Sequence, residues 1–464
     1  MNKNGENMLK EFDFEKLPIV EVVNEIIVDA ANRHASDIHF DPLFEYMKVR
    51  IRIDGQLQDY SKVPNTLKKN LITRIKIISG MNITEVRLPQ DGSIKTKLKD
   101  LDLDLRVSCV PTSNGEKIVV RILDYSMSLK GIDNLGFTPS NYNKLEELIK
   151  VPNGIILVTG ATGTGKSTTV YSILQRLNSP ERNIITVEDP IEMDIEGINQ
   201  IQVNSDIGLN FAHVLRSILR QDPNVIMVGE IRDNETARIA VRASITGHLV
   251  LSTIHTNNSL NTIERLLDME VERYLLASAL KGVISQKLAR RLCDKCKVKK
   301  QTNDYEKNLF RKVLNKEVNE IYVPQGCSEC SKGYRGRIAI HEVLVITQEI
   351  RDAIAGNVRK ESLRKLVYTS NVTTLLQDGL LKVLDGITTM EEVVKLIELD
   401  DDVDGKMSDY KYNLDKALDD VEIANNADIN TDNKPQAKIV SETKNVELPK
   451  KENIPNAHTP EDLY

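Results

Sequence analysis

The sequence has no uninterrupted apolar run that approaches the ~20 residues a membrane-spanning helix needs. Its first residues, Met1 to Asn7, are polar and are followed by no apolar signal core, so we expect a cytosolic protein. The net charge of only −6 gives no overall electrostatic reason to expect nucleic-acid binding. There are only five cysteines, and a reducing cytosol disfavours disulfides between them.

A glycine-rich stretch in the middle of the sequence carries the strongest signal. The apolar run at 155–159 predicts a buried strand, and the spacing of apolar residues over 169–177 predicts a helix. A glycine loop ending in Lys-Ser between a strand and a helix is typical of phosphate binding, because its N–H groups and the helix N-terminus attract a polyphosphate. A glycine turn that carries a lysine by chance is the alternative. The predicted nucleotide-binding residues are Gly160, Ala161, Thr162, Gly163, Thr164, Gly165, Lys166, Ser167 and Thr168. Lys166 should reach the β- and γ-phosphates, and Ser167 should ligate Mg²⁺.

Two acidic residues follow predicted strands farther along the chain. The strand at 224–228 ends in Gly229-Glu230, where glycine replaces the usual aspartate, so Glu230 is the candidate to polarise or align the attacking water. Glu188 follows the strand at 184–187, and acids at such strand ends face the ligand crevice of an open α/β sheet. An exposed glutamate and a solvated loop are the respective alternatives.

Two histidines, His248 and His255, flank a further predicted strand at 249–253. Their neighbours include threonines and an asparagine, so they could sense a γ-phosphate through hydrogen bonds. A purely structural role is the alternative for each histidine.

Four of the cysteines form a CxxC…CxxC pair, Cys293 and Cys296 with Cys327 and Cys330. Each pair can offer two thiolates to one tetrahedral Zn²⁺, and four thiolates close a structural site. Two disulfides are the alternative, and Cys109 is expected in a core.

The seven basic residues around the first cysteine pair make either a solvated face or a surface for anionic lipid or a platform protein. They are Lys287, Arg290, Arg291, Lys295, Lys297, Lys299 and Lys300.

The chain divides into five expected segments. We expect a disordered N-terminus at 1–17, an N-terminal α+β lobe at 18–125, a linker at 126–136, an ATPase domain at 137–399 and a disordered acidic tail at 400–464. Within the ATPase domain, strands and helices alternate to about residue 261. From there to 399 the pattern is mostly helical, apart from a cysteine-bearing insertion at 293–330. A weak helix is possible at 414–421.

Several motifs occur in one fixed order, and together the sequence resembles the secretion ATPases that power type II secretion and type IV pilus assembly (GspE/PilB-like). The phosphate loop matches their Walker A motif, 187–192 their Asp box, 228–233 their atypical Walker B motif and 246–257 their His box. Supporting matches lie at 35–39, 87–92, 333–337 and 378–380. The resemblance covers roughly 18–399.

The resemblance implies an α/β fold: a RecA-like P-loop ATPase domain with an N-terminal PAS-like α+β lobe, a small four-cysteine zinc insertion and a helical C-terminal part. It implies a homo-hexamer that uses ATP, Mg²⁺ and Zn²⁺, with catalysis by Glu230, Glu188, Arg106, Arg121, His248 and His255. Arg106 and Arg121 match arginines of the N-terminal lobe that reach the phosphates. Alternation of inward apolar residues over 101–109 independently leaves Arg106 on a polar face.

The predicted function is a hexameric cytoplasmic ATPase motor. It would drive pilus assembly or secretion pseudopilus assembly through an inner-membrane platform protein, at the cytoplasmic face of that membrane and without nucleic acid. The alternatives are a retraction motor, which the cysteine insertion disfavours, a DNA-uptake motor, and a nucleotide-binding scaffold without turnover. Unlike larger members of that family, the sequence shows no extra N-terminal docking domain, and it adds the acidic tail.

Overall fold

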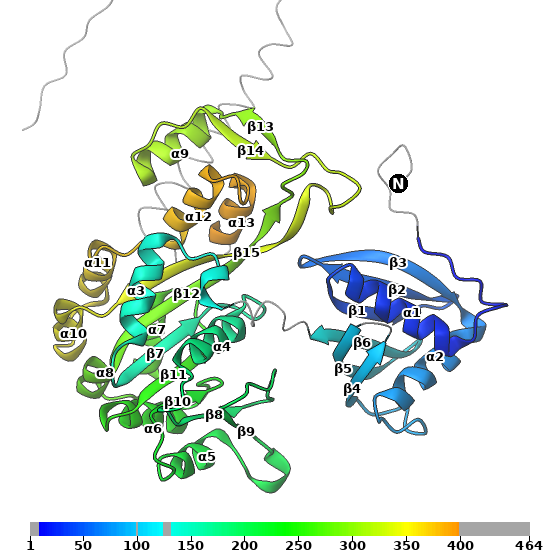
Figure 1. Ribbon diagram of the computed structural model, residues 1–464, viewed down its shortest axis with the longest axis horizontal. Coiled ribbons are helices and arrows are strands. Elements are labelled where there is room, and N and C mark those ends of the chain that lie inside the picture. The colour runs from blue at the N-terminus through cyan, green and yellow to red at the C-terminus, as the bar shows by residue number, and fades with distance from the viewer. Residues whose placement is uncertain (1–8, 99–100, 124–130, 399–464) are drawn as a thin grey trace, which may run out of the picture. The chain divides into compact units, whose positions relative to one another are not determined.

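The computed structural model describes residues 9–98, 101–123 and 131–398 (Figure 1). The predictions for residues 1–8, for the linker at 126–130 and for the acidic tail at 400–464 with its weak helix lie outside the described residues. Two sheets organise the described chain, one within residues 35–123 and one within residues 154–345. The mixed α/β fold class predicted from the sequence is confirmed.

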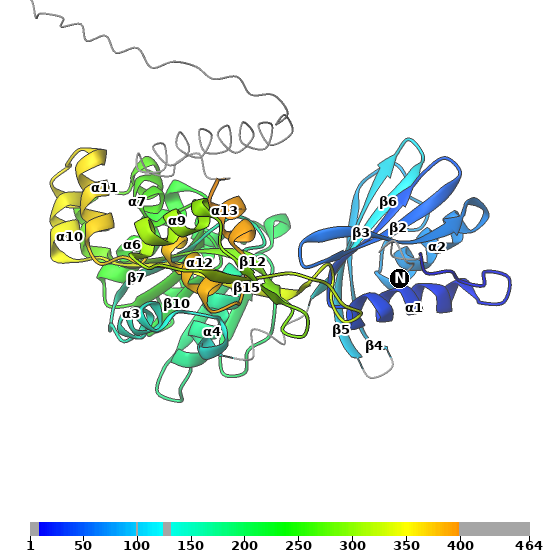
Figure 2. The same ribbon diagram turned by 90° about the horizontal axis from the view of Figure 1, so that it is seen from above.

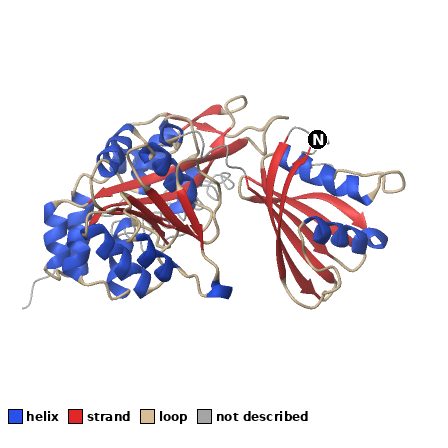
Figure 3. Ribbon diagram, turned by 60° about the horizontal axis from the view of Figure 1, so that its bottom comes forward, coloured by secondary structure: helices blue, strands red, loops and turns tan. Residues whose placement is uncertain are grey.

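The N-terminal lobe is a six-stranded antiparallel sheet in the order β3-β2-β1-β6-β5-β4. Two helices, α1 (Ile19–Asn32) and α2 (Asn65–Ile78), pack side by side against one face of it (Figure 3). Helix α1 begins directly after Pro18 and buries a stripe at helical spacing that includes Val22, Ile26 and Ala30. The strands are β1 (Ala35–Pro42), β2 (Tyr46–Ile53), β3 (Gln56–Pro64), β4 (Gln90–Leu98), β5 (Leu101–Thr112) and β6 (Gly115–Leu123).

Residues 9–17 differ from the expected disordered N-terminus. The Lys10 N–H donates to the Tyr60 carbonyl, and the Phe12 side chain is 8% exposed against the Tyr60 ring. The expectation of disorder is therefore wrong for these residues. It rested on the polar composition of the segment, but one apolar anchor is enough to hold a short extended segment against an existing core.

The second lobe is built on a seven-stranded sheet in the order β15-β12-β7-β11-β10-β8-β9. All neighbouring strands are parallel except β15, which runs antiparallel to β12 at one edge. The strands are β7 (Gly154–Thr159), β8 (Ile184–Glu188), β9 (Asn199–Gln202), β10 (Val225–Val228), β11 (Leu249–Ile254), β12 (Leu280–Leu292) and β15 (Tyr334–Val345).

Helices cover both faces of this sheet (Figure 3), which is why its central strands are buried throughout and mostly apolar. On β7, Ile155 and Leu157 pack toward α5 to α8, α10 and α11, whereas Ile156 and Val158 pack toward α3 and α4. The helices on the first face are α5 (Phe211–Ile218), α6 (Asn234–Ile245), α7 (Ser259–Asp268), α8 (Arg273–Ala279), α10 (Gln348–Ala355) and α11 (Lys360–Thr369). On the second face lie α3 (Pro139–Ile149) and α4 (Lys166–Leu177).

The region after residue 261 is less helical than expected. The predicted helical C-terminal part is present from Gln348 onward and includes α12 (Leu375–Leu384) and α13 (Met390–Glu398). Residues 280–292 and 334–345, however, form the long antiparallel pair β12 and β15. Apolar residues at 280, 284, 288 and 292 fit a helix by spacing alone, but pairing with β7 on one side and β15 on the other overrides that local preference.

The segment between β12 and β15 forms a small insertion that packs against α12. It contains α9 (Asp304–Leu314) and a two-stranded sheet of β13 (Val298–Gln301) and β14 (Glu320–Val323). Figure 2 shows α9 and the long β12 and β15 pair from above. Among the described helices, none combines the length and the apolarity that crossing a membrane requires.

Candidate active site and metal centre

The phosphate loop joins β7 to α4, as its sequence predicts. The Lys166 ammonium donates to the carbonyls of Gly160 and Ala161, at 2.8 and 3.0 Å, and the residue is 8% exposed. Burial lowers the pKa of Lys166, while the nearby charge of Glu230 opposes this shift. The lysine is thus held over its own loop, beside the acid that follows β10.

Strand β12 supports this loop from the side. The Gln286 side chain donates to the Thr164 carbonyl at 2.7 Å and accepts from the Thr169 hydroxyl at 2.8 Å. Gly160 has φ +149°, and a Cβ there would lie 2.5 Å from the Gln286 carbonyl oxygen. The sequence analysis missed Gln286, because it took this stretch for a helix. Only the pairing of β12 with β7 reveals that Gln286 reaches the loop.

Glu230 follows β10 and lies between the side chains of Arg232 and His255. Its Oε1 lies 2.5 Å from Nη2 of Arg232, and its Oε2 lies 3.4 Å from Nε2 of His255. The Glu230 side chain is 12% exposed. Burial, followed by the charge of Lys166, lowers the pKa of His255, so its imidazole is biased toward the neutral form near pH 7. Lys166, Glu230 and His255 therefore converge at the carboxyl edge of the sheet.

The glycine at 229, in place of the usual aspartate, has a packing explanation. Strands β8 and β10 approach so closely that a Cβ at this position would lie 3.3 Å from the Glu188 Cα and 3.3 Å from the Val187 carbonyl oxygen. The Gly229 N–H also donates to that carbonyl at 2.8 Å. A side chain here would push the two strands apart.

His248 is not part of this cluster. It precedes β11 and lies beside Gly154 at the start of β7, whereas the phosphate loop follows the end of β7. Its Nδ1 is 2.9 Å from the Ala243 carbonyl oxygen at the end of α6. His255 lies seven residue steps after His248 along an extended strand, or about 23 Å at ~3.3 Å per step. The structure therefore does not bring the two histidines together, and the sensing role expected of His248 stays a prediction.

Glu188 ends β8 and is 3% exposed. Its carboxylate accepts hydrogen bonds from the side chains of Tyr171, Thr186 and Gln200. This geometry does not favour the predicted direct catalytic role, because three donors already occupy the two oxygens.

Arg106 and Arg121 face each other as a register pair on β5 and β6. The inward neighbours Leu105, Val107 and Val120 are buried, which places both arginines on the polar face of the sheet. The Arg121 Nε donates to Asp37 Oδ1 at 3.0 Å. The structure thus groups these arginines as predicted, and their contact with a nucleotide stays a prediction.

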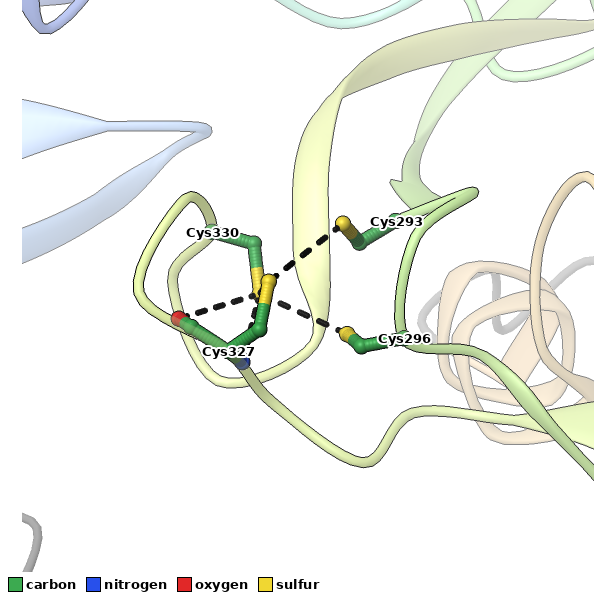
Figure 4. Close-up of side chains that lie close together, drawn as sticks. All are labelled: Cys293, Cys296, Cys327 and Cys330. Carbon is green, nitrogen blue, oxygen red and sulfur yellow. Dashed lines mark hydrogen bonds between the residues drawn. The ribbon is translucent and has the colours of Figure 1, made fainter.

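The four cysteines at the ends of β12 and β15 form one cluster (Figure 4). The antiparallel pairing of these strands brings the two CxxC turns together although 30 residues separate them. Sulfur–sulfur distances are 3.9 Å for Cys293–Cys327, 3.6 Å for Cys296–Cys330 and 3.6 Å for Cys327–Cys330. A tetrahedral Zn²⁺ with Zn–S bonds of about 2.3 Å places its sulfurs about 3.8 Å apart, so the cluster fits zinc.

The same distances are too long for the alternative of two disulfides, which needs about 2.05 Å. All five cysteines are free, and Cys109 lies in the core of the N-terminal lobe, as expected.

The basic residues around the first cysteine pair are largely neutralised. Six of the seven predicted members form ion pairs with carboxylates of the described chain: Arg290 with Glu392, Arg291 and Lys297 with Asp294, Lys295 with Glu329, Lys299 with Glu320, and Lys300 with Glu306. The Lys287 ammonium donates to the Leu396 carbonyl. This pattern favours the solvated-face interpretation over a free basic surface.

Comparisons with known proteins show the family of this chain. The family described as "Type II/IV secretion system protein" matches residues 13–395. The chain belongs to this family. It is 44% identical over 393 residues to the type II secretion system ATPase E of Vibrio cholerae, covering 84% of this chain and 77% of that protein. It is 46% identical over 374 residues to the type IV pilus assembly ATPase PilB of Thermus thermophilus, covering 80% of this chain and 42% of that protein.

Solved structures show the same fold. The Legionella pneumophila ATPase DotB matches with a TM-score of 0.63 at 22% identity, covering 85% of this chain and 99% of that one. The pilus retraction motor PilT with bound ADP matches with a TM-score of 0.57 at 26% identity, covering 83% and 98%. The chain is an ATPase of the class that drives secretion and pilus systems.

Proposed function

We propose that this ATPase is a homo-hexameric motor for the assembly of a type IV pilus or a type II secretion pseudopilus. It acts at the cytoplasmic face of the inner membrane on a platform protein there, without nucleic acid. The observation that carries the proposal is the convergence of Lys166, Glu230 and His255 at the carboxyl edge of the sheet. ATP hydrolysis needs, at one place, a cation that binds the phosphates and a carboxylate that orients the attacking water.

Each group has a distinct task in hydrolysis. The loop N–H groups and Lys166 bind the phosphates, and the Ser167 hydroxyl is placed at the start of α4 to ligate Mg²⁺, which neutralises phosphate charge when bound. Glu230 orients the attacking water and accepts its proton, with Arg232 and His255 fixing the carboxylate. Arg106 and Arg121 approach the phosphates from the N-terminal lobe, where such arginines stabilise transition-state charge.

The four-cysteine cluster favours assembly over retraction. Its geometry fits one Zn²⁺, and retraction motors of the family generally lack this insertion. The sequence identity to the pilus assembly ATPase, 46%, also exceeds the 26% to the retraction motor. Both observations support a motor that extends a filament.

The test of the catalytic proposal is the Glu230→Gln variant. It should still bind MgATP but hydrolyse it at least ~10²-fold more slowly, because the amide cannot accept the proton of the water. Glu235→Gln, on the exposed side of α6, serves as the matched control and should hydrolyse ATP at the parent rate. Parent activity in Glu230→Gln would refute the assignment.

The biological role is tested in cells. Deletion of the gene, followed by complementation with the parent or with Glu230→Gln, is scored for surface pili, secreted protein and DNA uptake. Only the parent should restore filaments or secretion. Restoration by Glu230→Gln would refute a motor, and loss of DNA uptake alone would favour the uptake motor. Light scattering of the purified protein with MgATP should give the mass of six chains, and a stable monomer would contradict the hexamer.

A further inference from the structure

We propose that Glu188 is a positioning residue that fixes the acidic loop at 189–195 through Tyr171 and Gln200, and that it does not act on the water or the metal. This inference rests on the proposed role of Glu230 as the acid that orients the water. It assigns new roles to Tyr171 and Gln200, neither of which belongs to the motifs found in the sequence.

The carboxylate of Glu188 is already committed to protein donors. Its Oε2 accepts from the Tyr171 hydroxyl, and its Oε1 accepts from the Thr186 hydroxyl at 2.6 Å and the Gln200 amide at 3.0 Å. A carboxylate offers about four acceptor positions, so three are filled. Since the residue is only 3% exposed, these donors replace water as its solvation. Only one acceptor position, on Oε2, is left, and it belongs to a residue that is almost fully buried. This arrangement therefore does not favour Glu188 as the general base.

The same donors fasten the acidic loop. The Tyr171 oxygen accepts from the Glu192 N–H at 3.0 Å. The Gln200 side chain donates to the Met193 carbonyl at 3.0 Å and accepts from the Ile195 N–H at 2.7 Å. Glu188 therefore orients two side chains, and these hold three successive points of the loop. Glu188 with Tyr171 and Gln200 is called the hub below. Removal of its carboxylate should increase the mobility of the whole loop at 189–195.

This hub also joins elements that the reaction uses. Tyr171 lies on α4, the helix whose first residue is Lys166, so its hydroxyl links the phosphate-loop helix to the acidic loop. The Glu188 backbone presses against Gly229, directly before Glu230. The hydrogen bond to Glu230, and after it the charges of Glu230 and of Asp189 in the loop, raise the pKa of Arg232. A displaced loop would change both the packing and the charge around Glu230.

The decisive comparison is Glu188→Gln against Glu230→Gln. The amide oxygen of a glutamine can still accept at one side, and the hydroxyls of Tyr171 and Thr186 can reverse to accept from its NH₂ group. We therefore expect Glu188→Gln to keep kcat within about tenfold of the parent, the scale of a lost or weakened hydrogen bond. Glu230→Gln should lose at least ~10²-fold. A Glu188→Gln variant as inactive as Glu230→Gln, with an unaltered loop, would overturn the inference.

Tyr171→Phe tests the loop itself. Without the hydroxyl, the Glu192 N–H loses its acceptor, so amide hydrogen exchange at 192–195 should speed up. We expect kcat to fall severalfold with little change in KM for MgATP, because the phosphate loop keeps its own contacts. Tyr274→Phe removes an equivalent hydroxyl from the exposed side of α8 and should change neither quantity. Unchanged loop exchange in Tyr171→Phe would refute the hub.

The double variant separates a shared pathway from independent effects. If Tyr171 and Glu188 act through one loop, the combined loss in kcat should equal the larger single loss rather than the product of both. Multiplying losses would contradict a common hub. These outcomes concern only Glu188 and Tyr171. Failure of the proposed function would instead show as parent activity in Glu230→Gln.

Discussion

His341 is a fully buried titratable side chain in β15. Its ring stacks on the ring of Phe137 at a centroid distance of 3.7 Å, and neither ring nitrogen has a hydrogen-bond partner among the described residues. Its backbone is tied to the buried pair of Asp378 and Lys382, because its N–H donates to the Asp378 carboxylate at 2.9 Å. Burial and then the charge of Lys382 hold the pKa of His341 well below its usual value.

This burial predicts an acid-sensitive fold. Above pH ~6.5 the histidine is neutral both folded and unfolded, so its titration has no effect. Below that pH the unfolded chain takes up a proton that the folded chain cannot. Stability should therefore fall with decreasing pH by up to ~1.4 kcal/mol per pH unit from this residue. Thermal unfolding of the parent and of His341→Phe, from about pH 7.5 to about pH 5, measures this pH dependence of the stability.

The variant should show the shallower slope, since phenylalanine keeps the ring contact and cannot titrate. Other groups whose pKa values are lowered, such as Asp41 and Glu392, contribute equally to both proteins and cancel in the comparison. Equal slopes would contradict the assignment to His341.

At single positions, the sequence predicted which strand ends carry polar side chains, but it did not predict which of these side chains lie close together. Glu230 and His255 meet as expected, because both follow neighbouring parallel strands, β10 and β11. His248 carries the same side chain but stands at the opposite end of β11, and residue type alone does not encode that. Glu188 is at the expected strand end, yet two of its three donors, Tyr171 and Gln200, come from α4 and β9, which only the fold brings near.

Among the elements, the phosphate loop depends on glycine for two different reasons. Gly160 and Gly163 both have positive φ, +149° and +78°. A Cβ on Gly160 would lie 2.5 Å from the backbone oxygen of Gln286, whereas a Cβ on Gly163 would meet nothing within 4 Å. At position 160, a side chain would have no space and would also disfavour the positive φ. At position 163, a side chain would have space and would only disfavour the positive φ.

The two substitutions should therefore differ. Gly163→Ala should cost roughly 1–2 kcal/mol for the left-handed backbone alone. Gly160→Ala should displace the loop from β12. It should therefore lower the affinity for MgATP by a much larger factor than Gly163→Ala does. Titration with a fluorescent ATP analogue, together with thermal unfolding, compares them. Equal affinities would show that β12 does not shape the loop.

Strand β12 shows why part of the fold escaped sequence analysis. It carries Gln286 against the phosphate loop and leads directly to Cys293 in the metal cluster. Its apolar spacing fits a helix, and only long-range pairing with β7 and β15 selects a strand. Strands β7, β8, β10 and β11 were predictable because short parallel strands that are buried on both faces carry runs of mostly apolar residues.

The cysteine cluster should hold one zinc ion per chain, which elemental analysis of protein purified under reducing conditions measures. Replacement of Cys296 by serine, or removal of metal by a chelator, should increase hydrogen exchange over 293–333 because bound zinc contributes folding free energy locally. Nucleotide binding should change little. Ser328→Ala, within the second CxxC turn, should keep the metal. A fully folded protein that contains no metal would contradict the zinc assignment.

At the scale of the whole chain, the two lobes are built on separate sheets. Among the described residues, no strand is shared between them, and each has its own hydrophobic core. Ile132 packs into the core of the ATPase lobe, so that lobe includes the residues from 131 onward. Both lobes therefore meet the requirement for folding alone, a separate core. This independence makes the proposed contribution of the N-terminal arginines testable.

If Arg106 and Arg121 meet the phosphates only when the lobes close, lobe position is coupled to nucleotide state, since a switch requires contacts that differ between its two states. Arg121→Ala should then lower kcat strongly, within the ~10³–10⁵-fold known for such arginines, and leave the fold unchanged. The Arg121 side chain is 62% exposed, so its removal opens no core. Lys117→Ala removes a cation from the same strand and serves as the control.

The isolated ATPase lobe, residues 131–399, should bind MgATP with nearly parent affinity, because Lys166 and Gln286 keep their contacts within it. It should hydrolyse ATP very slowly even when concentrated, and added lobe 9–123 should restore part of the rate. Restoration should fail when the added lobe carries Arg121→Ala, which separates a catalytic arginine from a general stabilising effect. Full activity of 131–399 alone would show that the N-terminal lobe is outside the active site. Hydrolysis could then not drive lobe movement through these arginines.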